Sequence, residues 1–187
     1  MSKEPPQIFV SHSRRDTKIL DFFDRAFART GVISKCMEFE EMQPPQWNEI
    51  DKQLETSIAT FLLLGPNVKS SAHTQNWIAF EVGLSCAYKK RVWVFEEMDS
   101  KISFPIPYVT DYMPYVLNEK ISFDYIREIL EGYRDDYYQV NNGKGIPIGF
   151  ETICWNCRAV FYTHQTIGAY YCPVCRTYSI PKKKITP

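Results

Sequence analysis

The chain has 187 residues, of which 44% are hydrophobic and 24% are charged, and its formal net charge is zero. This length allows one domain of ordinary size and a small second module. The composition is typical of a globular protein, and it excludes both a disordered chain and a uniformly basic nucleic-acid coat. The charge is unevenly distributed, because residues 151–187 carry +4 and residues 1–150 carry −4.

The opening residues, MSKEPPQIFV, contain no apolar segment of signal-peptide length, and no apolar run approaches the length of a membrane span. Six cysteines in a chain without an export signal favour a reducing compartment, where thiols bind metal or fill the core. We therefore expect a cytoplasmic protein that has no membrane partner.

Short apolar runs alternate with amphipathic segments as far as residue 133. Strands are expected near residues 8–10, 32–37, 60–64 and 92–95, and helices near 16–27, 47–57, 76–88 and 122–133. The segment 102–115 contains three prolines, so we expect a long loop with a short helix there. The alternation predicts an α/β fold with a mostly parallel sheet and helices on both faces.

The helix expected at 76–88 places an indole and a carboxylate one turn apart. Apolar residues recur at three- and four-residue spacing from Trp77 to Tyr88 and form one face. Glu81 lies four residues after Trp77, among apolar neighbours. This acid must face a cleft or have a partner, because a buried unpaired carboxylate is very costly. The alternative to a cleft is a structural acid paired with Lys89 or with a neighbouring chain.

Two CxxC pairs near the C-terminus predict a metal site. Fourteen residues separate the pairs, and each pair has the spacing that places two thiolates on one metal ion. The four predicted zinc ligands are Cys154, Cys157, Cys172 and Cys175. Such a closed site leaves no coordination position for catalysis, so Zn²⁺ would be structural. The alternative is four unrelated buried cysteines. The other two cysteines, Cys36 and Cys86, are expected to fill the core.

These patterns divide the chain into three parts. We expect an α/β domain at residues 1–136, a linker rich in glycine and proline at 137–150, and a zinc ribbon with a basic tail at 151–187. The positive charge and the tyrosines of the ribbon are compatible with contact to a protein or nucleic-acid partner. The other interpretation is a zinc-bound cap that stabilises an oligomer.

Three stretches resemble successive conserved motifs of Toll/interleukin-receptor (TIR) domains: IFVSHSRRD, IDKQLETSIATFLLLGPN and NWIAFEVGLSCAYKKRVWVF. The resemblance covers roughly residues 7–133. Its most specific part is the W-x-x-x-E motif from Trp77 to Glu81, although Ile78 stands where many members have cysteine. The resemblance implies a flavodoxin-like sheet of about five parallel strands. For members with this glutamate, it also implies cleavage of NAD⁺ into nicotinamide and linear or cyclic ADP-ribose.

The resemblance further implies a prokaryotic defence or signalling effector that is activated by self-assembly, and therefore a homo-oligomer. Glu81 would be the catalytic residue. The substrate-binding residues that it implies are His12, Ser13, Trp77, Glu40, Glu41 and Trp47. The chain contains neither a G-x-G-x-x-G motif nor a P-loop. The alternative function is a non-enzymatic TIR signalling or scaffold module whose zinc ribbon docks a partner.

Overall fold

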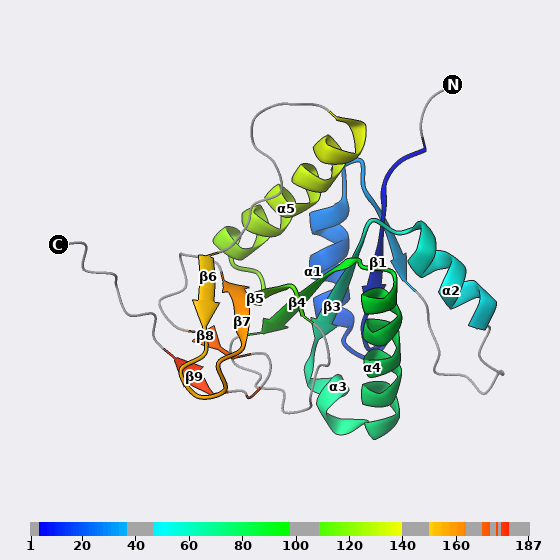
Figure 1. Ribbon diagram of the computed structural model, residues 1–187. Helices are drawn as coiled ribbons and strands as arrows, with labels where there is room; N and C mark the ends of the chain where they lie inside the picture. Colours follow the sequence, from blue (N-terminus) through cyan, green and yellow to red (C-terminus); the bar gives the residue numbers. More distant parts are fainter. Residues whose placement is uncertain are drawn as a thin grey trace.

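The computed structural model describes residues 4–36, 47–97, 109–139, 150–163, 170–172, 175 and 177–179. A parallel five-stranded sheet with the order β2-β1-β3-β4-β5 is at its centre (Figure 1). The strands are β1 (Gln7–Ser11), β2 (Ile33–Cys36), β3 (Ala59–Leu64), β4 (Arg91–Glu97) and β5 (Asp111–Tyr115). This confirms the predicted α/β class and parallel sheet. The strand order is flavodoxin-like, and its direction of growth reverses between β1 and β3.

In the parts of the chain that the structure describes, five helices connect and cover these strands. They are α1 (Thr17–Phe27), α2 (Trp47–Thr56), α3 (Pro66–Ser70), α4 (Ala72–Ala87) and α5 (Lys120–Tyr138). Helices α1 and α5 pack on one face of the sheet, and α2, α3 and α4 pack on the other (Figure 1). Within the described parts of the chain, no helix is both long and apolar enough to cross a bilayer.

Alternation along the strands divides the core between the two faces. In β3, Phe61 and Leu63 belong to the cluster under α1 and α5, whereas Leu62 and Leu64 face α4. All six residues of β3 are buried, as expected for a central parallel strand covered on both faces. The first cluster is rich in aromatic rings, and Phe23 packs edge-on against Phe95 with ring centroids 5.1 Å apart.

The fifth strand corrects the predicted loop at 102–115, because residues 111–115 form β5. Pro114 is responsible for the error, since proline disfavours the interior of a sheet. The structure accommodates it because β5 is the last strand in the sheet order and pairs with β4 alone within the sheet. All five residues of β5 are nevertheless buried, because helix and C-terminal residues cover this edge.

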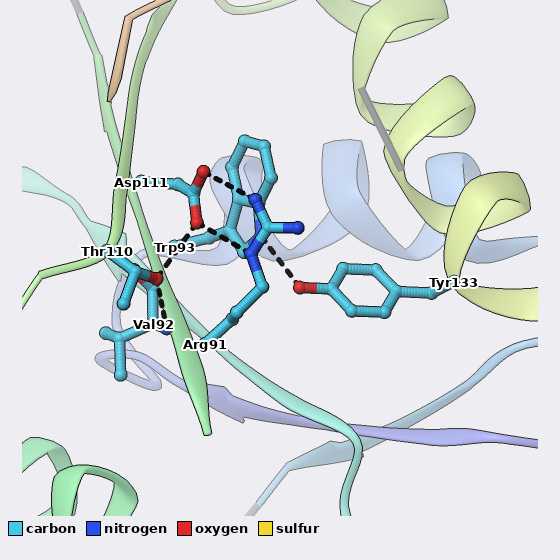
Figure 2. Close-up of polar contacts among 6 residues, drawn as sticks. All are labelled: Arg91, Val92, Trp93, Thr110, Asp111 and Tyr133. Atoms are coloured by element: carbon cyan, nitrogen blue, oxygen red, sulfur yellow. Dashed lines mark hydrogen bonds and ion pairs between the residues drawn. The ribbon is translucent and has the colours of Figure 1, made fainter. Parts of the chain in front are cut away.

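A bidentate ion pair joins the starts of β4 and β5 (Figure 2). In Arg91, Nε and Nη2 donate to the two carboxylate oxygens of Asp111 at 3.0 and 2.6 Å. The guanidinium lies 5.2 Å from the centroid of the Trp93 ring, and the indole N–H of Trp93 donates to the hydroxyl of Tyr133 at 2.9 Å. This cluster fixes α5 to β4 at the end of the sheet opposite the strand C-termini.

The C-terminal residues form a small β module. Strands β6 (Phe150–Ile153) and β7 (Val160–Thr163) are antiparallel, as are β8 (Tyr170–Tyr171) and β9 (Tyr178–Ser179). The module lies beside β5, on the same face of the sheet as α4 (Figure 1). Cys154 and Cys172 share one hydrophobic cluster with Leu62, Val94 and Tyr112. The module therefore completes, together with α4, the core over β4 and β5.

Candidate functional site

Helix α4 carries the predicted catalytic glutamate on its most buried face. Its N-terminus is capped by Ser71, whose Oγ accepts from the N–H of Thr74 at 3.2 Å. The buried residues of α4 are Ile78, Glu81, Val82 and Ser85. This face differs from the apolar face predicted from Trp77 to Tyr88, whose residues are partly buried against α2 and β1. Glu81 is only 4% exposed, so its surroundings are the sheet and not bulk water.

The carboxylate of Glu81 has a defined partner at the end of β1. The hydroxyl of Ser11 donates a hydrogen bond to Oε2 of Glu81. Because side chains alternate along a strand, Ser11 points to the same face of the sheet as Phe9, which packs under α2 and α4. Ser11 is the last residue of β1, and β1 adjoins β3 at the reversal of strand order. Open α/β sheets bind ligands at this crevice.

Burial has the largest effect on the pKa of Glu81. It raises the pKa of this carboxyl from 4.5 to about 7, and the hydrogen bond from Ser11 opposes the rise because it favours the charged form. Near neutral pH, both protonation states are therefore well populated. A buried carboxyl with such a pKa at the end of a parallel strand has the properties of a catalytic acid or base. No salt bridge to Lys89 accounts for Glu81, because its partner is Ser11.

The described cavities do not open onto this carboxylate. One of about 770 Å³ lies between the residues before β1 and helix α2, and another of about 380 Å³ lies beside the start of α1. Neither is lined by Glu81.

The structure places three of the predicted substrate-binding residues. His12 and Ser13 directly follow β1; Nδ1 of His12 lies 3.1 Å from the carbonyl oxygen of Val10, and Ser13 is buried. The indole N–H of Trp77 donates to Nε2 of His73 at 2.9 Å, one turn earlier on α4. This contact holds the N–H edge of the indole near the start of the helix.

The remaining predicted substrate-binding residues are not placed against the site. Glu40 and Glu41 lie outside the described residues. Trp47 is the first residue of α2, but its side chain also lies outside the description. Their predicted contact with substrate stays a prediction.

The four predicted metal ligands converge. The sulfur atoms of Cys154, Cys157, Cys172 and Cys175 all lie within 4.8 Å of one another. The Cys154–Cys175 and Cys157–Cys172 sulfur pairs are each 3.5 Å apart. Four sulfurs at the Zn–S bond length of a tetrahedral site would be separated by about 3.8 Å. The cluster could therefore hold a zinc ion, as the CxxC spacing predicts.

Both CxxC turns have the same backbone hydrogen bonds. The N–H of Cys154 donates to the carbonyl of Ala159, and the N–H of Cys172 donates to that of Thr177. In each turn, the N–H of the second cysteine points to the sulfur of the first at 3.5 Å. Such N–H groups stabilise a thiolate, so this repetition supports a metal site more strongly than sulfur proximity alone.

The two sides of the cluster differ in exposure. Cys154 and Cys172 are fully buried against the sheet, whereas Cys157 is exposed. Burial opposes ionisation of Cys175, but its hydrogen bonds with Thr177 and the one that it accepts from the side-chain amide of Asn156 outweigh burial and lower the pKa of this thiol to about 5. A thiolate is the form that binds zinc. The other two cysteines, Cys36 and Cys86, are exposed, so the prediction that they fill the core is wrong.

No protein-family model matches this chain, and a search of curated proteins finds no match either. The TIR resemblance is therefore an interpretation of the motifs, and the functions that it implies are proposals.

Two groups near the strand ends were missed by the sequence interpretation. Ser11 lies just beyond the strand expected at residues 8–10. Because side chains alternate along a strand, its spacing of two residues from Phe9 is the signal that could have placed both side chains on the same face of the sheet. Asp16 directly precedes α1, and its carboxylate accepts from the backbone N–H of Asn67 at 3.1 Å and from Nδ2 of the same residue at 2.6 Å. No local pattern could reveal that contact, since 51 positions separate the two residues.

Proposed function

We propose that this protein is an NAD⁺ glycohydrolase or cyclase that breaks the nicotinamide–ribose bond. The observation that carries the proposal is the buried Glu81 carboxyl facing Ser11 at the switch point of a flavodoxin-like sheet. The W-x-x-x-E motif from Trp77 to Glu81 adds the TIR resemblance. We propose a prokaryotic defence or signalling effector that acts as a homo-oligomer, with self-assembly as its trigger.

One carboxylate is enough for this chemistry. The nicotinamide of NAD⁺ is already cationic and leaves as a neutral molecule, so no general acid is needed to protonate it. The ionised form of Glu81 would accept hydrogen bonds from the ribose hydroxyls and stabilise the oxocarbenium-like charge. In the structure, the hydroxyl of Ser11 donates a hydrogen bond to that carboxylate. Substrate hydroxyls would replace the hydroxyl of Ser11 as donors.

The surrounding residues would position the substrate. His12 and Ser13 would line the ribose side at the end of β1, and the ring of Trp77 would provide an apolar wall one turn before Glu81. Glu40, Glu41 and Trp47 would contribute from the segment that covers the pocket. Water or a nucleophile on the adenine of the same substrate would then capture the ribose, giving linear or cyclic ADP-ribose.

The cysteine cluster has a structural role in this proposal. Its four thiolates would fill the coordination sphere of Zn²⁺ and leave no open position for substrate. The metal would hold the C-terminal module against the sheet face that also carries Ile78 and Val82 of α4. It therefore supports the helix that carries Glu81 without taking part in bond cleavage.

The direct test is incubation of the purified protein with NAD⁺, followed by chromatographic separation of the products. Wild-type protein should release nicotinamide, and Glu81→Gln should not. Glu96→Gln is the matched control, because Glu96 is equally buried and also accepts from a hydroxyl, that of Tyr112. Equal turnover by the wild type and Glu81→Gln would refute the catalytic role. The product peak would also distinguish hydrolysis from cyclisation.

A second candidate is a non-enzymatic signalling or scaffold module. One observation that favours it is the hydrogen bond from Ser11, which already occupies the carboxylate of Glu81. The other is a group of exposed hydrophobic side chains around the first CxxC turn: Ile153, Trp155 and Val160. Such a module would use this surface to dock a protein or nucleic acid. Absence of nicotinamide release even from concentrated, self-associated protein, together with partner binding lost on Trp155→Ser, would favour this candidate.

A further inference from the structure

Three exposed hydrophobic side chains surround the first CxxC turn of the C-terminal module. Ile153 and Val160 are cross-strand partners on β6 and β7, and Trp155 lies in the turn between them. Cys154 is fully buried, so its neighbours Ile153 and Trp155 face outward. The module lies at the edge of the molecule beside β5 (Figure 1). We name these three side chains, together with Arg158 of the same turn, the turn surface.

Trp155 is the unusual member of the turn surface. It is 62% exposed, the highest value among the large hydrophobic residues in the described part of the chain. Within that part, its indole neither packs on another ring nor donates its N–H to an acceptor. Tryptophan is highly buried on average, because its ring carries a large apolar area. An indole that the fold leaves exposed is available to stack on a ligand.

The charge around the turn surface has one sign. Glu151 is the last acidic residue of the chain, so residues 152–187 contain five lysine and arginine side chains and no aspartate or glutamate. The four thiolates and Zn²⁺ together would contribute −2, which leaves this segment positive. Arg158 is exposed, and no carboxylate pairs with its guanidinium among the described residues. Its backbone N–H donates to the carbonyl of Cys154 at 3.0 Å, so one hydrogen-bonded turn carries both the cation and the indole.

These features distinguish between two kinds of partner. A hydrophobic protein surface would match Ile153 and Val160, but it would not account for a segment that has cations and no acids. A polyanion accounts for the charge, and flat rings on that polyanion account for Trp155. Nucleic acid has both, and a single strand presents bases whose faces are free to stack on an aromatic side chain. A base inside a duplex is already stacked on both faces.

We propose that the turn surface binds single-stranded nucleic acid, with a base stacked on the indole of Trp155 and the phosphate backbone paired with Arg158 and the other cations of residues 152–187. Ile153 and Val160 provide an apolar flank for the stacked base. Every base has a face that can stack, so binding should be tolerant of sequence. This inference names the partner of the second candidate function, and it does not depend on cleavage of NAD⁺.

The experiment measures the fluorescence anisotropy of a fluorescein-labelled oligothymidylate of about 12 nucleotides, titrated with the full-length, zinc-loaded protein in the absence of NAD⁺. We expect a Kd of about 1–100 µM at physiological salt. The logarithm of the binding constant should fall with the logarithm of salt concentration with a slope of about −2 to −3.5, as about three to five phosphate contacts require. A duplex of the same length should bind more weakly.

Substitutions of Trp155 separate stacking from simple hydrophobic contact. Trp155→Leu keeps an apolar side chain but removes the ring, and it should weaken binding at least about fivefold. Trp155→Tyr keeps a ring and should retain most of the affinity. Because the residue is exposed, both variants should fold, and zinc content and circular dichroism verify this.

Substitution of Arg158 tests the phosphate contact. Arg158→Gln should weaken binding and make the salt slope shallower by about 0.7, the value for one phosphate contact on a single strand. Lys52→Gln is the matched control, because it removes an exposed cation from α2, and it should bind like the wild type.

Three results would overturn the proposal. The first is equal oligonucleotide affinity of the wild type and Trp155→Leu. The second is tighter binding of the duplex than of the single strand. The third is self-association that is lost in Trp155→Leu, seen by sedimentation without any oligonucleotide binding, because it would make a second copy of the chain the occupant of the turn surface. None of these results bears on the catalytic role of Glu81, which the NAD⁺ assay tests separately.

Discussion

The hydroxyl of Ser11 donates a hydrogen bond to the carboxylate of Glu81, which lies 70 positions later in the chain. The contact joins the end of β1 to the middle of α4 across the sheet face. Among the described residues, Ser11 is the polar partner that counters the rise in the pKa of this buried acid. The stability of the fold and the availability of Glu81 for chemistry therefore depend on the same contact.

Stability should fall as pH rises through the pKa of Glu81. The folded-state pKa, about 7, lies above the value of 4.5 for an exposed glutamate, so the folded state favours the protonated acid. Its stabilising effect is complete below pH 4.5 and is lost as pH rises through 7, at a cost of about 3 kcal/mol. Urea unfolding between pH 5 and 8 should show this loss in the wild type. It should be absent from Glu81→Gln, and parallel pH profiles of the two proteins would contradict the assignment.

Removal of the Ser11 hydroxyl should raise the pKa of Glu81 above 7, because its hydrogen bond favours the carboxylate. The measurement is a ¹³C NMR titration of the side-chain carboxyl in Ser11→Ala. If the proposed chemistry holds, activity at pH 7 should also fall, since less of Glu81 is ionised. Ser13→Ala provides the control for the pKa measurement, because Ser13 is buried after the same strand and its Oγ accepts a weak 3.4 Å contact from the N–H of Arg15. An unchanged or lower pKa in Ser11→Ala would contradict the prediction.

Removal of metal should destabilise more than the C-terminal module. Cys154 and Cys172 are buried with residues of β3, β4 and α4, so chelation would leave polar thiols in a shared core. We expect a loss of at least about 3 kcal/mol in unfolding free energy, since zinc binding contributes directly to folding. Thermal unfolding with and without a chelator measures it.

Substitution of single cysteines should reveal the asymmetry of the cluster. Cys172→Ser should destabilise more than Cys157→Ser even without metal, because only the former buries a hydroxyl. The control is Cys86→Ser, an exposed cysteine outside the cluster, which should retain both zinc and stability. Equal effects of Cys172→Ser and Cys86→Ser would be inconsistent with a metal centre.

The Arg91–Asp111 pair should behave as a buried ion pair. Asp111 has a side-chain exposure of 2%, so Arg91→Met would leave an uncompensated carboxylate and cost about 3–5 kcal/mol. Adding Asp111→Leu should recover most of that loss, because two apolar side chains then replace both charges. Chemical unfolding of both single variants and the double variant measures the coupling. Additive losses would show that the pair does not act as a unit.

The sequence pattern was sufficient for the α/β class because a central strand such as β3 is apolar along its length and a helix such as α1 has a buried stripe. It failed at β5, where Pro114 looks like a loop residue and only tertiary packing makes the segment a strand. The metal cluster was predictable because cysteine spacing along the chain directly determines a metal-binding turn. The short helix α3 gave no periodic pattern to detect.

For the site, the motif identified Glu81 but not its environment. Helix α4 has apolar residues on two faces, and either face could pack against β1 and β3. The rotation of the helix about its own axis therefore decides whether Glu81 faces solvent or the sheet. The structure buries Ile78 and Val82, and this rotation carries Glu81 inward to Ser11. The predicted face from Trp77 instead lies toward α2. Pairings between distant residues, such as Asp16 with Asn67, have no local signature.

The position of the cysteine module has a consequence for biosynthesis. The apolar surface of Leu62, Val94 and Tyr112 is translated well before Cys154 and Cys172, which complete its covering. Until the chain has been translated past Cys172, that surface remains open to water and to other nascent chains. Closure of this surface therefore follows synthesis of the cysteine module. If the four cysteines hold zinc, a cell short of zinc should accumulate the protein in a chaperone-bound or aggregated form.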